Sequence, residues 1–264
     1  MKWIRAALLF SLPAFAASLL LARVHPFGDA GLYAAQGEAA PILNHGHVPD
    51  AARLVLAEKC ADCHSDQTRV PIYAHIAPAS WLVERDIVEA RRAMNLSRWS
   101  SYSADQQQTL AAKVVQEAKS HDMPPLQYRL IHWNAGIQQS DVAVFAAWAH
   151  ASPGSGSASQ LAGEGDAERG KALFERRCTG CHALAENKEG PALQGVFGRA
   201  SGTAAGFAYS AALKKAAIVW DEPSLDKWLA DPDAFVAGND MDFLVSKAQE
   251  RLDLISYLRQ SSGK

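Results

Sequence analysis

The pattern Cys-Xaa-Xaa-Cys-His occurs twice in this chain of 264 residues, at Cys60-Ala61-Asp62-Cys63-His64 and at Cys178-Thr179-Gly180-Cys181-His182. Two thiols at this spacing can form thioether bonds to a porphyrin, and the adjoining histidine is placed to bind its iron. The chain has four cysteines, and the two motifs use all of them. The sequence therefore predicts two covalently bound haem c groups, held by Cys60, Cys63 and His64 and by Cys178, Cys181 and His182.

Other uses of four cysteines explain less of this pattern. A structural zinc site would bring two cysteine pairs within about 15–20 residues of each other, whereas Cys178 follows Cys63 by 115 positions. A thioredoxin-like redox pair belongs next to a βαβ pattern, which the sequence lacks. Disulfide bonds would leave His64 and His182 unexplained.

The scarce methionines supply candidates for the sixth iron ligand. A methionine ligand raises the reduction potential and fills the iron's last position, which favours electron transfer. Met123 follows His64 by 59 residues, and Met241 follows His182 by the same 59 residues. The repeated spacing predicts two single-haem modules of similar plan, with His64 and Met123 on one iron and His182 and Met241 on the other.

The first iron has more than one candidate for its sixth ligand. His121 lies two residues before Met123, and His75 lies 11 residues after His64. A lone histidine is more often a surface or hydrogen-bonding residue than a ligand, and a methionine can also serve as a core filler. Met123 is the preferred ligand, with His121 and His75 as alternatives.

Composition divides the chain into five segments. Residues 1–23 form a signal or membrane anchor, residues 24–48 an irregular tether, and residues 49–150 the first haem module. A glycine- and serine-rich run predicts a flexible linker over 151–163, and residues 164–264 form the second module. Each module has about 100 residues, a common domain size.

The N-terminus predicts export. Lys2 and Arg5 precede residues 6–22, an apolar stretch without charge. Cleavage after Ala14-Phe15-Ala16 would leave apolar residues at the new terminus, so we expect an uncleaved anchor. The modules would then lie on the periplasmic side of a bacterial inner membrane, or in the periplasm if the segment is cleaved.

Charge excludes some partners. The formal net charge is −2, and neither module has a surplus of basic residues. Nucleic-acid binding therefore has no electrostatic support, and strong steering onto a highly acidic partner is not indicated.

Local signals predict an all-α fold that places each motif at the end of a helix. In the first module we expect Asp50 to cap a helix into Cys60 and Ser103 to open a capping box. A helix over 80–94 should bury Trp81, Ile87 and Val88 and point Glu84 outward with Arg85, Arg91 and Arg92. Further helices are expected over 51–59, 104–119, 141–150 and 247–259, from Asp166 to Cys178, and from residue 222 with Asp221 or Ser224 as cap.

Residues 164–260 resemble class I cytochromes c, close to the mitochondrial type. The matching stretches are Gly165-Asp166, Gly170-Lys171, Cys178–His182, Gly190-Pro191-Ala192-Leu193, Gly195–Arg199, Gly206–Tyr209, Trp220, Met241 and Asp253–Leu258. The resemblance implies an all-α fold around haem, with crossing first and last helices and with His182 and Met241 as axial ligands. It also implies that the Pro191 carbonyl orients the His182 ring and that Arg199, Tyr209 and Trp220 line the haem propionates.

Some positions depart from that family's pattern. The family usually has Pro-Gly before the ligand methionine, whereas this chain has Ala237-Gly238-Asn239-Asp240-Met241, which lacks the stiffness of proline. Leu213 aligns with an asparagine that is common near the haem. The lysine-rich docking ring of mitochondrial members is largely missing, so their partners cannot be transferred to this chain.

Residues 24–149 resemble a bacterial haem-binding domain family. The matching stretches are Val24-His25-Pro26-Phe27-Gly28, Cys63-His64-Ser65 and the segment from Pro71 to Val83. The resemblance implies one covalent haem with His64 as the proximal ligand.

Together these features predict a dihaem c-type cytochrome, an electron carrier rather than an enzyme, acting alone or as a subunit of an oxidoreductase. It would pass single electrons between exported or membrane-bound redox proteins, and no small-molecule substrate is expected. The alternatives are a dihaem peroxidase-like enzyme and a gas-binding haem protein. Both would use an open position on the first iron, with His121 or Glu117 assisting in the enzyme.

Overall fold

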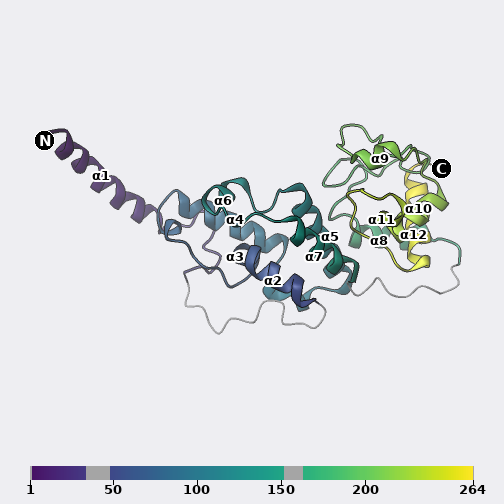
Figure 1. Ribbon diagram of the computed structural model, residues 1–264, viewed down its shortest axis with the longest axis horizontal. Coiled ribbons are helices and arrows are strands. Elements are labelled where there is room, and N and C mark those ends of the chain that lie inside the picture. Colours follow the sequence, from purple (N-terminus) through teal and green to yellow (C-terminus); the bar gives the residue numbers. More distant parts are fainter. Residues whose placement is uncertain (1, 34–47, 152–162, 264) are drawn as a thin grey trace. The chain divides into compact units, whose positions relative to one another are not determined.

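The computed structural model describes residues 2–33, 48–151 and 163–263 (Figure 1). These residues form helices and turns, and no strand occurs among them. Within these ranges, Ala200 and Val219 form an isolated antiparallel β-bridge. The all-α class expected from the sequence is confirmed.

Close approaches between Cα atoms divide the chain into two compact units. One unit is residues 1–45 with 53–100, and the other is residues 46–52 with 101–264. Most of the expected tether and of the expected linker lies outside the described residues, at 34–47 and 152–162. The module boundaries therefore remain predictions.

The N-terminal helix α1 (Lys2–Leu21) includes both basic residues of the N-terminus and Pro13. No helix in the described ranges is long and apolar enough to cross a membrane. The expected membrane anchor, and the localisation that depended on it, are therefore wrong. Lys2 and Arg5 stand within α1 and leave only residues 6–21 uncharged, a shorter stretch than the about 20 apolar residues that span a bilayer.

The first motif consists of Cys60 and α3 (Ala61–His64), which follow α2 (Asp50–Lys59) directly. Helix α4 (Ala79–Ala93) packs against α3 and against the 3₁₀ helix η1 (Ile72–His75). A second 3₁₀ helix, η2 (Leu96–Ser101), follows α4. The buried residues of α4 are Ser80, Glu84, Ile87 and Ala90, which share one helical face because they are three or four residues apart. The outward direction expected for Glu84 is therefore wrong.

Beyond residue 100, the first helices of the second unit are α5 (Ala104–Ser120), α6 (Leu126–Ile131) and α7 (Gln139–Ala151). The predicted capping box is confirmed, because Ser103 and Gln106 exchange side-chain and backbone hydrogen bonds. Ala111 and Val115 of α5 and Phe145 and Trp148 of α7 are buried, and the two helices pack together.

In the cytochrome-like part of the second unit, α8 (Ala167–Arg177) crosses α12 (Ala248–Ser261). Figure 1 shows these two helices together in the green and yellow part of the chain. A Cβ at Gly170 would lie 2.0 Å from the Asp253 carbonyl oxygen, so only glycine permits this approach. Between them come α9 (Ala211–Lys215), α10 (Glu222–Ala230), which Asp221 caps, and α11 (Pro232–Phe235).

The crossing encloses one apolar core. Its buried members come from α8, α10, α12 and the intervening loops: Leu173, Phe174, Val196, Trp220, Leu225, Trp228, Leu229, Val236, Val245, Leu254, Ile255 and Leu258. Met241 and Cys178 pack at the edge of this core, so the second motif and its candidate ligand methionine meet the same apolar surface.

Candidate haem sites

The second motif starts where α8 ends. Cys178 is the C-cap of α8, and the Cys178 carbonyl accepts hydrogen bonds from the backbone N–H groups of Cys181 and His182. This tight turn brings both thiols and the imidazole to one end of the helix. Cys178 packs against the apolar core, and this burial raises the pKa of its thiol to about 12.

The imidazole of His182 is held in one orientation. Its Nδ1 lies 2.9 Å from the carbonyl oxygen of Pro191, to which the ring N–H donates. Burial lowers the pKa of His182, which favours the neutral ring with an unprotonated Nε2. A neutral imidazole fixed through Nδ1 is the form that binds iron.

Gly190 makes room for this ring. A Cβ at position 190 would lie 2.2 Å from Cε1 of His182, closer than any side chain could come. The glycine before Pro191 is therefore required by the ring itself.

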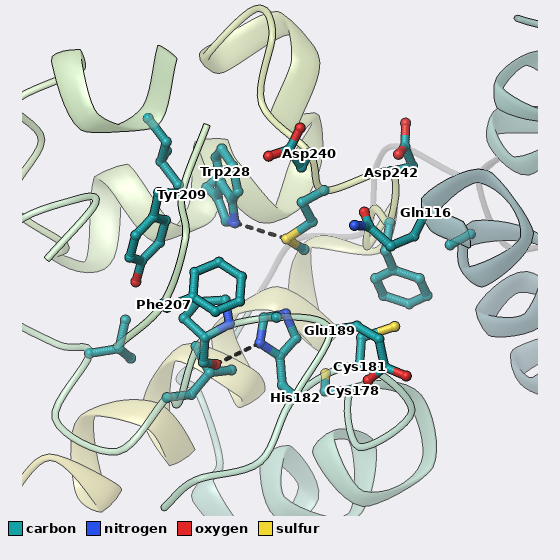
Figure 2. Close-up of a pocket in the computed structure, with 18 of the residues that line it drawn as sticks. Gln116, Cys178, Cys181, His182, Glu189, Phe207, Tyr209, Trp228, Asp240 and Asp242 are labelled. Atoms are coloured by element: carbon teal, nitrogen blue, oxygen red, sulfur yellow. Dashed lines mark hydrogen bonds between the residues drawn. The ribbon is translucent and has the colours of Figure 1, made fainter. Parts of the chain in front are cut away.

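Met241 is positioned by two residues that sequence reasoning did not single out. The indole N–H of Trp228, on α10, donates to the Met241 sulfur at 3.1 Å, the dashed line from Trp228 in Figure 2. The side-chain oxygen of the buried Asn239 accepts from the Met241 backbone N–H at 2.6 Å. The Asn239 amide in turn donates to Asp233 and to the Val236 carbonyl, so hydrogen bonds hold the loop in which proline was missing.

A cavity of about 390 Å³ lies between these groups. Figure 2 shows His182 and Trp228 on opposite sides of it, with Phe207 and Tyr209 along one wall. Its lining includes every residue expected to surround the second haem, namely Cys178, Cys181, His182, Pro191, Arg199, Tyr209, Trp220 and Met241.

The donors around the cavity fit a haem. Two thiols, an oriented imidazole and a thioether sulfur are the ligand types of a c-type haem. The two Nη groups of Arg199 donate to the carbonyls of Gln194 and Ala192, but its Nε is buried without a partner among the described residues. A buried, unpaired guanidinium N–H suits an acidic group such as a haem propionate.

The first motif repeats part of this arrangement. Nδ1 of His64 lies 3.2 Å from the carbonyl oxygen of Met94, which follows α4. Burial lowers the pKa of His64 and raises the pKa of Cys63 to about 11. Met94 had no role in the sequence analysis, because it follows His64 by 30 positions and no local pattern indicates that the two residues are in contact.

The candidates for the first iron's sixth ligand lie in different units. Met123 is 41% exposed and belongs to the second unit, as does His121, which ends α5 with a φ of 60°. His75 belongs to the first unit with His64, and its ring lies 5.7 Å from the ring of Tyr33. The choice of Met123 over His121 and His75 stays a prediction.

Glu84 forms a polar cluster in the first unit that the sequence did not reveal. Its Oε1 lies 2.8 Å from Nδ1 of His25 and accepts from the Tyr33 hydroxyl at 3.1 Å. Burial is the main cause that raises the pKa of Tyr33 to about 12, with the hydrogen bond to Glu84 second. In the sequence, the only sign of this site is that Glu84 lies three residues before Ile87 and therefore on the same face of α4.

Two families match the chain. The model of the haem-binding domain matches residues 26–151, and the model of cytochrome c matches residues 167–262.

Individual proteins match the second of these regions. A cytochrome c of Euglena viridis is 53% identical over 98 residues, which are 36% of this chain and 96% of that protein. A cytochrome c of Chlamydomonas reinhardtii is 47% identical over 103 residues, 38% of this chain and 92% of that protein. The solved structure of cytochrome cH from Methylobacterium extorquens is 42% identical, with a TM-score of 0.35, over 36% of this chain and 99% of that one.

Proposed function

Because this chain belongs to the cytochrome c family and also carries a haem-binding domain, we propose that it is a dihaem electron carrier. Each module, over 49–150 and 164–264, would hold one covalent haem between a histidine and a methionine. The haem supplies one-electron chemistry when bound. The donor and the acceptor would be other redox proteins.

The observation that carries this proposal is the closed ligand set of the second module. His182 is tied to Pro191, Met241 is tied to Trp228 and Asn239, and an apolar cavity separates the two ligand side chains. Residues held this firmly would stay bound to the iron of a haem in the cavity and would leave no position on it for a substrate. Such a site favours electron transfer over chemistry at the iron.

The residues around the ligands have separable roles. The Pro191 carbonyl keeps the proton of His182 on Nδ1, and apolar burial disfavours a second proton on the ring. The indole of Trp228 restrains the sulfur and withdraws electron density from it. Arg199 would neutralise an acidic edge of the cofactor through its unpaired Nε.

The His64 site supports the same role for the first module. Its imidazole is fixed by the Met94 carbonyl as His182 is by Pro191. We propose Met123 as its sixth ligand, on the spacing that Met123 shares with Met241.

Near-infrared magnetic circular dichroism of the oxidised, haem-loaded full chain tests the proposal. Methionine-to-iron charge-transfer intensity for two haems per chain is the expected result. Methionine-to-iron intensity for one haem, together with a bis-histidine signal for the other, would show that His121 or His75, and not Met123, is the sixth ligand of the first iron. A high-spin signal would instead indicate an open first iron and overturn the pure electron carrier in favour of a reactive or gas-binding haem.

A further inference from the structure

One side of α5 lines the cavity of the second haem site. The residues involved are Thr109, Ala112, Gln116 and Ser120, with Glu117 beside them. Steps of three and four residues place the first four on a single helical face. Figure 2 shows Gln116 on the opposite wall from Tyr209 and near Cys178 and Cys181. A helix from the haem-binding domain thus closes the cavity on the side of the thioether cysteines.

Two ion pairs hold α5 to the loops that carry the axial ligands. Nζ of Lys113 lies 2.9 Å from Glu189, the residue before Gly190 on the histidine side. Nζ of Lys119 lies 2.8 Å from Asp242, the residue after Met241. The pairs are six residues apart on α5, so the helix spans from one ligand loop to the other.

A buried polar network continues this contact at the start of α5. The Gln108 amide donates to the Leu244 carbonyl at 3.0 Å, and its oxygen accepts from Arg177. Both side chains are almost completely buried. Arg177 also donates to Glu250 at 2.7 Å. A buried polar group without a partner lowers the stability of the protein, so removing Arg177 would leave the Gln108 oxygen without this hydrogen bond.

The haem motif itself leaves space for α5. A Cβ at Gly180, within the second motif, would lie 3.1 Å from Cγ2 of Thr109. The glycine therefore lets the motif backbone approach α5 closely, at the point where a redox protein would need to reach the haem edge.

We propose that α5 is the resident occupant of the haem-edge face of the second module, held there by Lys113 and Lys119 against Glu189 and Asp242. The inference rests on the proposed function in taking the second cavity as a haem site. The partner of this face is then a helix of the same chain that presents Lys113 and Lys119, which explains why acidic residues stand here and a lysine ring does not. Lys113 and Glu189 are partly exposed, whereas the Asp242 side chain is buried. Salt therefore weakens the Lys113–Glu189 pair most, and an outside protein would have to displace α5.

Carbodiimide cross-linking of the haem-loaded full chain, followed by peptide mass spectrometry, tests the contact. Zero-length links Lys113–Glu189 and Lys119–Asp242 should form within one chain and decline as salt rises. The pair Lys247–Glu250, joined at 2.9 Å three residues apart, serves as the internal control and should be linked with or without α5 in place.

A matched variant separates specific from incidental links. Lys113→Gln should abolish the Glu189 link and leave the Asp242 link, whereas Lys171→Gln, at an exposed position of α8, should change neither. Formation of the Lys247–Glu250 link without either α5 link would overturn the proposal. So would links that join ¹⁴N and ¹⁵N chains in a mixed sample, since α5 would then bind another copy.

The result is independent of the dichroism experiment. A first haem without methionine would overturn the dihaem carrier while the α5 links still form. Two methionine-ligated haems without the α5 cross-links would support the proposed electron carrier and would overturn the proposal that α5 occupies this face.

Discussion

At the scale of single residues, each proposed axial ligand of the second site is positioned by its neighbours. Pro191 selects the tautomer of His182 by keeping the proton on Nδ1, and Gly190 gives the ring its space. On the other side, Trp228 donates to the Met241 sulfur. Hydrogen bonds to the ligands of a metal tune both its affinity and its potential, so these neighbours decide how firmly the ligand set stays closed.

Replacing the donor to the sulfur should loosen Met241. In Trp228→Phe the ring is kept and the N–H is lost, so we expect imidazole to displace the methionine about 10-fold more easily, the lower end for loss of such a partner. Titration of the oxidised protein with imidazole, followed by the haem absorption bands, measures this. Trp133→Phe, at an 87% exposed side chain, is the control, and equal affinities in both variants would contradict the role of Trp228.

At the scale of helices, the crossing of α8 and α12 holds the second module together. Asp253 of α12 accepts hydrogen bonds from the Asp166 backbone, from Gln249 and from both Nε and an Nη of Arg169. Burial by itself raises the pKa of Asp253, but the bonds from Arg169, Asp166 and Gln249 outweigh it and hold the pKa below the ordinary 3.8. The ionised carboxylate is therefore the form that ties the two helices.

Removing this charge should destabilise the module in a pH-dependent way. We expect Asp253→Asn to lower the free energy of unfolding by about 1–3 kcal/mol at pH 7. A lowered pKa contributes stability above the ordinary value and loses it as the pH falls through the folded value. The difference from the parent protein should therefore shrink below pH 3.8.

Urea unfolding of the haem-loaded chain at pH 7 and at stepwise lower pH measures this difference. Glu168→Gln, at an exposed site in the first turn of α8, should change the stability little at any pH. A constant difference between Asp253→Asn and the parent protein across the acid range would show that the carboxylate's charge is not involved.

At the scale of the whole molecule, the proposal requires two independent haem attachments. The double variant Cys178→Ser with Cys181→Ser should carry one haem per chain instead of two, because each motif attaches its own cofactor. Mass spectrometry of the denatured protein, together with the pyridine haemochrome assay, counts the haems.

The reciprocal variant, Cys60→Ser with Cys63→Ser, should also carry one haem. An unchanged count in either variant would mean that its motif holds no cofactor. Met241→Ala, which keeps all four cysteines, should retain both haems and thereby separate attachment from ligation.

Patterns local in the chain predicted much of this molecule. The motifs, the caps at Ser103 and Asp166, and the all-α class depend on residues within a few positions of one another, whose geometry the backbone itself dictates. The apolar segment at the N-terminus was misjudged as an anchor because its charges were counted as flanks, whereas α1 includes them.

The sequence by itself determined which residues could bind haem and where helices would begin, because these properties follow from side-chain chemistry and short-range spacing. Tertiary structure alone decided that Glu84 is buried, that Met94 orients His64, that Trp228 and Asn239 secure Met241, and that α5 closes the second cavity. Each of these depends on contacts between distant segments, and such contacts form only when packing brings different helix faces and loops together.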